Sequence, residues 1–277
     1  MKTSCTLCPH HCALAPGQTG RCHARRNIDG KVTCINHSRI TALALDPIEK
    51  KPLYRFHPGT KVLSVGSFGC NLSCPWCQNH TIATSDGHSN ELQIETIGPA
   101  QIARYSLELV PEGNIGIAYT YNEPFIMYEF VRDCAQLVHD QGQYNIVVSN
   151  GMVCEEPLRE LLPLIDALNI DLKGFTQDFY DLCSGDLETV KRTIEICRES
   201  AHVEVTTLVI PELNDDPDQV EKAARWLAGL DPEIPYHLSR FFPCHLMNDR
   251  GPTPLDALEK LAERARRHLR HVYLGNV

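Results

Sequence analysis

Three cysteines within one short stretch carry the clearest chemical signal in the chain. Cys70, Cys74 and Cys77 are spaced x3 and x2, and they directly follow an apolar run. Thiolates are soft ligands that suit zinc or iron–sulfur clusters. A four-iron cluster held by only three cysteines keeps one iron free of protein, and catalytic metal sites use such an open position for water or substrate. The spacing therefore predicts a site at which a bound small molecule is activated.

Two simpler interpretations of these cysteines stay open at this point. His80 follows Cys77 at x2, so the three cysteines and this histidine would complete a closed Cys3His zinc site. A ferredoxin-like run would need a fourth cysteine nearby, but the next one is Cys134. We favour the three-cysteine cluster over both.

A second group of cysteines lies near the N-terminus, among several histidines. Its closely spaced members are Cys5, Cys8, Cys12 and Cys22. Four thiolates suffice for a closed zinc site or for an auxiliary [4Fe–4S] cluster, and spacing does not choose between them. Because residues 1–60 contain little periodic apolar sequence, a metal must supply much of their stability. We therefore predict a cysteine-rich metal-binding region over residues 1–60 and a core over residues 61–277.

Composition narrows the choice of partners and compartment. The 277 residues carry a net charge of −9, which argues against a nucleic-acid partner. No apolar run approaches the ~18 residues that a membrane span needs, and the first residues lack the apolar region of a signal peptide. We expect a cytoplasmic protein with no membrane partner. In that compartment thiols stay reduced. We therefore expect the clustered cysteines among the thirteen to bind metal and not to form disulfides.

Six apolar, strand-like runs alternate with helical patterns from residue 61 onward. They are Val62–Phe68, Ile115–Tyr121, Asn145–Ser149, Ala167–Leu172, Val203–Ile210 and Tyr236–Phe241. Nearly continuous apolar runs with β-branched residues are typical of parallel strands buried on both faces. Six such alternations predict an α/β fold with right-handed crossovers. A partial (β/α)6 barrel and a flat doubly wound sheet both fit this count.

The segments between these runs have helical periodicity. Apolar residues from Met127 to Val138 recur at i, i+3, i+4 and i+7, and Gly142 is suited to end that helix. Asp216 followed by Pro217 precedes another apolar stripe, which is typical of an N-cap with proline at the first helical position.

Polar residues follow or end the successive strands. In parallel α/β folds, ligands bind at the carboxyl ends of the strands, so these residues should share one site. The candidates are Glu123, Asn150, Asp171, Lys173, Thr206 and Arg240. For Asp171 and Lys173, a purely structural pair on one face of a strand is the simpler alternative.

The three-cysteine stretch, with Trp76 directly before its last cysteine, resembles the radical S-adenosylmethionine (SAM) superfamily. The resemblance favours the partial barrel. It narrows to the glycyl-radical-activating branch, whose best-known member is pyruvate formate-lyase activating enzyme, and further to the radical SAM enzymes of the AmmeMemoRadiSam system. The segments that carry the narrower likeness are Asp46–Tyr54, Cys74–Asn79, Tyr119–Pro124 and Tyr273–Val277.

This resemblance implies a mechanism. A [4Fe–4S] cluster on Cys70, Cys74 and Cys77 would bind the amino and carboxylate groups of SAM at its free iron and pass an electron into the sulfonium. The products would be methionine and a 5′-deoxyadenosyl radical, which takes a hydrogen atom from a substrate. A reductant such as flavodoxin or ferredoxin would be needed. The substrate would be a glycine Cα–H on a partner protein or a small molecule.

A different class of function stays open beside it. If zinc closed both cysteine groups, the chain would be a non-catalytic interaction module stabilised by metal.

The needs of SAM also suggest roles for the strand-end residues. Asn150 and Asp171 are expected to hold the ribose, with Lys173 close by to pair with a carboxylate. Glu123 is expected to receive the amino group, and Thr206 and Arg240 complete the expected SAM site.

The chain departs from the resembled families at two places. Activating enzymes commonly have Gly-Gly-Glu near SAM, whereas this chain has Tyr121-Asn122-Glu123, so only Glu123 carries over. Fewer glycines mean a less close approach of the backbone to the ligand. The AmmeMemoRadiSam enzymes often continue into a short cysteine-containing tail, and this sequence stops at Val277.

Overall fold

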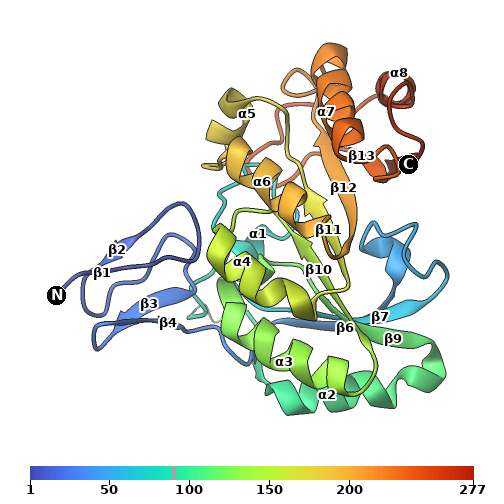
Figure 1. Cartoon of the computed structure of the whole chain (residues 1–277). Coiled ribbons are helices and arrows are strands. Elements are labelled where there is room, and N and C mark those ends of the chain that lie inside the picture. Colours follow the sequence, from blue (N-terminus) through green and yellow to red (C-terminus); the bar gives the residue numbers. More distant parts are fainter. Residues whose placement is uncertain (89–91) are drawn as a thin grey trace.

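One mostly parallel sheet of eight strands organises the chain (Figure 1). The computed structural model describes residues 1–88 and 92–277. Six parallel strands form the middle of the sheet: β7 (Lys61–Gly66), β9 (Asn114–Tyr119), β10 (Tyr144–Ser149), β11 (Ala167–Asp171), β12 (His202–Val209) and β13 (Tyr236–Arg240). These are the six strands that the apolar runs predicted, so the α/β class is confirmed.

Two further strands extend the sheet at its edges. β6 (Ala42–Pro47) pairs antiparallel with β7, and β14 (Val272–Gly275) pairs parallel with β13. The strand order is β14-β13-β12-β11-β10-β9-β7-β6, so β14 and β6 lie at opposite ends of an open sheet. The sheet therefore includes a strand from residues 1–60. The sequence prediction missed β6 because its Ala-Leu-Ala-Leu run lacks β-branched residues.

Helices connect the parallel strands and cover the sheet. They are α1 (His80–Ala83), α2 (Pro99–Glu108), α3 (Tyr128–Asp140), α4 (Glu155–Leu161), α5 (Gln177–Asp181), α6 (Leu187–Cys197), α7 (Pro217–Leu230) and α8 (Leu255–Ala265). Short 3-10 turns are η1 (Ile48–Lys50), η2 (Val110–Glu112), η3 (Pro124–Met127) and η4 (Leu162–Leu164).

Local signals explain where two of these helices begin and end. Asp216 accepts a hydrogen bond from the backbone N–H of Asp218 and Pro217 opens α7, as the sequence predicted. Gly142, with φ of +69°, follows α3. The apolar stripe of α3 is buried against the sheet, including the fully enclosed Phe130. Burying such a side chain stabilises the fold by about 1.5–3 kcal/mol.

The first forty residues form small antiparallel ribbons that project from one side of the sheet (Figure 1). Their strands pair as β1 (Thr3–Ser4) with β2 (Ala13–Leu14) and β3 (Arg25–Ile28) with β4 (Lys31–Cys34). A third short pair joins β5 (Arg39–Ile40) to β8 (Glu95–Thr96).

The buried carboxylate of Glu204, near the amino end of β12, binds the backbone of the segment that follows β6. Glu204 has no exposed surface, and its Oε2 lies 2.6 Å from Nε2 of His237. Its two oxygens also accept the backbone N–H groups of Tyr54 (3.0 Å) and Arg55 (2.7 Å). Burial opposes ionisation, but these bonds and one with His202 outweigh it and lower the pKa of Glu204 to about 2.

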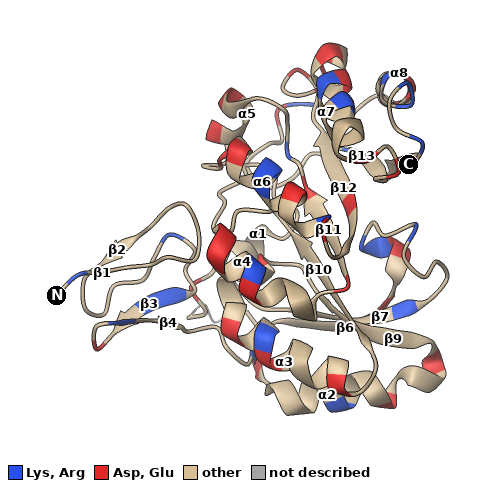
Figure 2. Ribbon diagram, in the orientation of Figure 1, with Lys and Arg blue, Asp and Glu red and all other residues tan. Residues whose placement is uncertain are grey.

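Charged side chains lie mainly on the helices, where lysines and arginines alternate with acidic residues (Figure 2). The strands of the central sheet carry few charges. Over residues 1–88 and 92–277, no helix combines the length and the apolar character that crossing a membrane requires.

Candidate active site

A cavity of about 260 Å³ opens at the carboxyl ends of the parallel strands. All three cysteines of the predicted cluster site line it, together with five of the six residues expected to bind SAM. The lining residues used below are Cys70, Cys74, Cys77, Tyr121, Glu123, Asn150, Asp171, Lys173, Thr206, Ser239 and Asn276. The topology therefore brings residues from β9, β10, β11, β12 and β13 to the cysteine loop.

The chain enters the cysteine loop through a backbone turn that only glycine fits. Gly69 has φ of +87°, and a Cβ built on it would lie 2.3 Å from the carbonyl oxygen of Cys22. Asn122 holds the preceding residues, since its Oδ1 accepts the N–H of Ser67 at 2.9 Å and its Nδ2 donates to the carbonyl of Phe68 at 3.2 Å. The turn thus fixes the direction in which Cys70 leaves β7.

The cysteines of this loop are half-buried and line the cavity. Burial and the nearby carboxyl of Glu123 raise the pKa of Cys70 well above its ordinary value. A hydrogen bond with Cys183, together with burial, raises the pKa of Cys74 in the same way. Metal binding would release these protons, because the thiolate is the form that binds metal. Of the thirteen cysteines, three line the cavity, and Cys183 lies behind it.

Asn150 contacts the cysteine loop directly. Its Nδ2 lies 3.5 Å from the sulfur of Cys70 and donates to Oδ1 of Asn71 at 2.9 Å. Its Oδ1 accepts the backbone N–H of Met152 at 2.8 Å. The amide that was expected at the ribose of SAM is therefore engaged with Cys70 and its neighbour. Hydrogen bonds to ligand sulfurs tune cluster potentials.

Glu123 fastens the ends of β9 and β10 to each other. Its Oε1 accepts from Oγ of Ser149 at 2.8 Å and from the N–H of Phe125 at 2.9 Å, while its Oε2 accepts the N–H of Asn150 at 2.9 Å. The residue is 2% exposed. Burial is the largest influence on this carboxyl and, despite the three hydrogen bonds, raises the pKa of Glu123 to about 7. Its contact with the amino group of SAM stays a prediction.

Asp171 and Lys173 form an ion pair at the end of β11, with 2.7 Å between Oδ2 and Nζ. The backbone of Lys173 is fixed by Tyr180, whose hydroxyl accepts its N–H, and by Asn214, whose Nδ2 donates to its carbonyl. Burial disfavours the charged ammonium, but Asp171 and the adjacent Cys74 outweigh it and raise the pKa of Lys173 above its ordinary value. A fixed positive charge therefore lies beside the cysteine loop.

The last two expected residues differ in position. Thr206 lines the cavity and donates to Oδ1 of Asn169 at 3.0 Å. Arg240 does not line it, because its Nε donates to the carbonyl of Thr253 at 2.8 Å and its guanidinium packs over Phe242. Ser239 lines the cavity instead. Successive residues of a strand point to opposite faces of the sheet. Ser239 and Arg240 are neighbours in the sequence, so only one of them faces the cavity.

Tyr121, which the sequence offered as a departure from glycine and as part of the Tyr119–Pro124 likeness, is a strained residue of the site. Its φ is +73°, a conformation that costs a residue with a side chain roughly 1–3 kcal/mol. Its hydroxyl donates to Oδ2 of Asp46 at 2.7 Å, and Nζ of Lys51 lies 4.7 Å from its ring centre. Lys51 also donates to Oδ2 of Asp46 at 2.9 Å. The likeness of Asp46–Tyr54 and of Tyr119–Pro124 to family motifs was the available signal for this network.

His80 does not line the cavity that Cys70, Cys74 and Cys77 share, so the structure gives no support to a closed Cys3His site. The ring of His80 stacks on His245 with 4.4 Å between centroids, and its Nδ1 lies 3.2 Å from the carbonyl oxygen of Cys77. In the part of the chain that the structure describes, no three His, Cys, Asp or Glu side chains stand close enough to hold one metal ion.

Comparison with known proteins identifies the class that this fold and site define. The sequence pattern of the radical SAM superfamily matches residues 64–227, so the chain belongs to that superfamily. The chain is also 37% identical, over 279 aligned residues, to the uncharacterized protein MJ0808 of Methanocaldococcus jannaschii. That match covers all of this chain and 82% of MJ0808.

Two solved structures share the fold. A radical SAM methyltransferase from Sphaerobacter thermophilus superimposes with a TM-score of 0.58 and 16% identity, covering 79% of this chain and 67% of that one. TYW1 with a lysine-pyruvate adduct bound gives a TM-score of 0.54 and 16% identity, covering 82% and 83%. At this identity the likeness concerns the fold alone.

Membership of the superfamily implies a [4Fe–4S] cluster and SAM. The side chains that line the cavity fit a [4Fe–4S] cluster and SAM. Three half-buried cysteines that line the cavity suit iron, and the amide of Asn150 faces one of their sulfurs. The charged pair of Asp171 and Lys173 lies at the same cavity, where a zwitterionic ligand finds both signs of charge.

Proposed function

We propose that this protein cleaves SAM reductively and uses the resulting radical to remove a hydrogen atom from a glycine Cα of a partner protein. The reaction would be of the glycyl-radical-activating type. One observation carries the proposal: the cysteine loop and polar residues from five strands line a single cavity. The likeness of the sequence to activating enzymes and to AmmeMemoRadiSam enzymes supports the choice of reaction.

The cavity supplies separate roles for its residues. The cluster, when bound to Cys70, Cys74 and Cys77, supplies the electron that breaks the carbon–sulfur bond of SAM. Asp171 is suited to accept from the ribose hydroxyls, and Lys173 is suited to pair with the carboxylate of SAM. Tyr121 holds the loop after β9 in a fixed conformation through Asp46. Radical SAM enzymes usually need a reductant, and flavodoxin or ferredoxin is the donor that we propose.

The position of the N-terminal region supports a protein substrate. None of residues 1–60, all of which the structure describes, lines the cavity, so this region does not close it against a partner. The loop after β13 lies beside the cysteine loop, because the N–H of Leu246 donates to the carbonyl of Pro75 at 2.9 Å. Leu246 is 76% exposed and Phe242 is 41% exposed. Of these two, Leu246 lies beside the cysteine loop and is suited to contact an entering chain segment.

Deuterium transfer tests the substrate class. The reduced enzyme and SAM would be incubated with soluble protein from cells grown on α-deuterated glycine, with the Cys74→Ala variant as control. We expect deuterium in 5′-deoxyadenosine and a glycyl doublet in the electron paramagnetic resonance (EPR) spectrum of a partner protein. Unlabelled 5′-deoxyadenosine that forms only with the dialysable fraction would instead assign a small-molecule substrate.

A further inference from the structure

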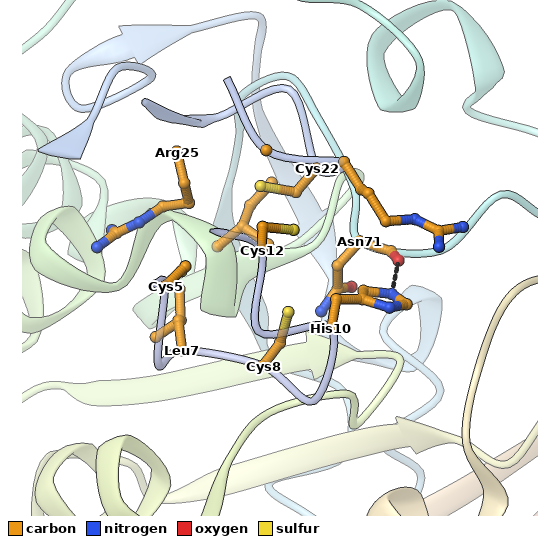
Figure 3. A pocket seen from close by; sticks show the side chains of 11 residues that line it. Cys5, Leu7, Cys8, His10, Cys12, Cys22, Arg25 and Asn71 are labelled. Carbon is orange, nitrogen blue, oxygen red and sulfur yellow. Dashed lines mark hydrogen bonds between the residues drawn. The ribbon is translucent and has the colours of Figure 1, made fainter. Parts of the chain in front are cut away.

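The four N-terminal cysteines surround one small cavity (Figure 3). Cys5, Cys8, Cys12 and Cys22 all line it, and three of them are buried. The sulfur atoms of Cys8, Cys12 and Cys22 point into the same space (Figure 3). Residues that are up to seventeen positions apart thus converge, although the segment has little apolar core of its own.

Backbone turns bring these cysteines together. The N–H of Cys5 donates to the carbonyl of Cys12 at 3.0 Å, and the N–H of His11 donates to the carbonyl of Cys8 at 3.1 Å. Gly20 donates to Arg25 at 2.7 Å, which turns the chain at Cys22. The cysteines therefore sit on two hydrogen-bonded turns rather than on a loose loop.

The remaining wall of the cavity suits a group with thiolate ligands. It consists of apolar, amide, imidazole and guanidinium groups from Leu7, His10, Gly20, Arg21, Arg25, Asn71 and Ile126. No carboxylate is among these residues, all of which lie in the described part of the chain. The guanidinium of Arg25 already pairs with the carboxylate of Glu129. Arg21 therefore remains as the wall residue whose positive charge favours a metal centre with four thiolates.

A cluster with one iron per thiolate fits these four cysteines better than a single ion does. Tetrahedral zinc with Zn–S bonds of about 2.3 Å needs sulfurs about 3.8 Å apart. Within the described residues, no three of these ligands stand close enough for one ion. The same is true of Cys70, Cys74 and Cys77, where membership of the superfamily implies a [4Fe–4S] cluster. A cluster binds one thiolate per iron and does not need three ligands around a single ion, so it fits both sets of cysteines.

The N-terminal cavity touches the catalytic loop on both sides of Cys70. On one side, the carbonyl of Cys22 packs against Gly69 so closely that a Cβ there would lie 2.3 Å away. On the other side, Asn71 is part of the cavity wall, and its carbonyl lies 2.8 Å from Nε2 of His10 (Figure 3). The same Asn71 accepts the amide of Asn150, which also contacts the sulfur of Cys70.

We propose that Cys5, Cys8, Cys12 and Cys22 hold a second [4Fe–4S] cluster, which receives the reducing electron and passes it to the cluster on the Cys70 loop. The proposal deepens the proposed function and rests on its SAM cleavage for the use of that electron. A low-potential one-electron donor of the flavodoxin or ferredoxin class loses one electron. The N-terminal cluster gains it and returns to its oxidised state when the catalytic cluster is reduced. No bond forms or breaks in this step.

The first test isolates the N-terminal site. A variant with Cys70→Ala, Cys74→Ala and Cys77→Ala would be reconstituted anaerobically with iron and sulfide and analysed for iron, sulfide and zinc. We expect about half of the wild-type iron and sulfide, and an EPR signal of a reduced cluster after dithionite. Loss of all iron, or stoichiometric zinc in its place, would overturn the proposal. This readout does not depend on SAM cleavage, so it is independent of the proposed function.

The second test measures electron transfer. The variant Cys8→Ser with Cys12→Ser should keep the catalytic cluster and its SAM-induced EPR change. Reduction of that cluster by reduced flavodoxin should slow by roughly tenfold or more, equivalent to about 1.4 kcal/mol in the barrier. An unchanged rate would refute the relay. Cys34→Ser is the matched control, because Cys34 is buried in the same region but bonds to Asn36 and does not line the cavity.

A single change guards against misfolding of the double variant. Cys12 is only half-buried, so Cys12→Ser disturbs packing least. It should show the same loss of iron and the same slow reduction, with far-ultraviolet circular dichroism like that of wild type. A folded Cys12→Ser protein with full iron content and normal reduction would contradict the proposal.

Discussion

The side-chain amide of Asn150 donates to the sulfur of Cys70 across 3.5 Å. This bond reaches the cluster ligand from the end of β10, a strand that lies next to β9 and two places away from β7. A donor at a ligand sulfur stabilises the reduced and more negative state of an iron–sulfur cluster. We therefore expect Asn150 to act as a positioning residue that influences the reduction potential of a cluster bound by Cys70.

Replacing this amide should lower the cluster potential. Asn150→Asp keeps the oxygen that accepts from Met152 but removes the donor to Cys70 and adds negative charge. We expect the cluster to assemble and its midpoint potential to become more negative in an EPR-monitored titration. Asn248→Asp, at an exposed position, is the control. A potential equal to that of wild type would show that the contact has no electronic effect.

Removal of Cys74 should abolish the cluster of the catalytic loop. Cys74→Ala leaves two cavity-lining thiols, so SAM should no longer be cleaved after dithionite reduction. The measurement is 5′-deoxyadenosine, together with EPR of the reduced protein. Cys197→Ala should retain cleavage, because Cys197 is buried in the core away from the cavity. Full turnover of Cys74→Ala would disprove the ligand assignment.

Asp171 should matter for SAM and not for the cluster. Asp171→Ala removes a carboxylate that lines the cavity and pairs with Lys173. SAM binding should weaken by about 1–3 kcal/mol, the usual cost of a lost hydrogen bond to a charged group. Isothermal calorimetry measures this affinity, and iron content should be unchanged. Glu188→Ala removes a comparable partner of Lys191 on the surface and should leave SAM affinity as it is.

The hydroxyl of Tyr121 should stabilise the folded protein. Tyr121→Phe removes its bond to the carboxylate of Asp46, and a hydrogen bond to a charged group contributes about 1.5–3 kcal/mol. Urea unfolding of the metal-free protein would measure the loss. In Tyr105→Phe only a bond to the neutral Gln101 is lost, so a smaller effect is expected. Equal losses in the two variants would argue against a special role for Tyr121.

Stability should fall in acid as Glu204 becomes protonated. Its pKa is lowered from 4.5 to about 2, so the ionised residue contributes stability above pH 4.5 that is lost as pH falls toward 2. The shift corresponds to a contribution on the order of 3 kcal/mol. Chemical unfolding at several pH values should show a shallower decline for Glu204→Gln than for wild type. Parallel curves for the two proteins would remove Glu204 from the acid response.

Sequence patterns predicted the parallel strands well because continuous apolar runs rich in β-branched residues, such as that of β12, are typical of strands buried on both faces. These patterns were less reliable in predicting which side chain at the end of a strand faces the cavity. Arg240 was predicted to bind SAM, but its neighbour Ser239 is the residue of β13 that lines the cavity, while Arg240 bonds to Thr253. Long-range contacts were also beyond reach. The bond between Tyr121 and Asp46 joins residues 75 positions apart, and no local pattern encodes it.

Asn150 shows the same limit in a different way. Its place after β10 correctly predicted that it would reach the site, because the carboxyl ends of parallel strands meet there. Its hydrogen bonds depend on where the cysteine loop turns back, which is set by Gly69 and Asn122. Spacing within the sequence does not contain that information.

The wall of the N-terminal cavity has a consequence for how the protein is made. Translation delivers Cys5 to Cys22 first, but two wall residues, Asn71 and Ile126, leave the ribosome much later. Until Ile126 has been synthesised, the four thiols belong to a nascent segment that cannot close. They then stand open to oxygen and to stray metal ions. Completion of this region should therefore await synthesis of the chain through η3 or depend on a factor that protects the thiols until then.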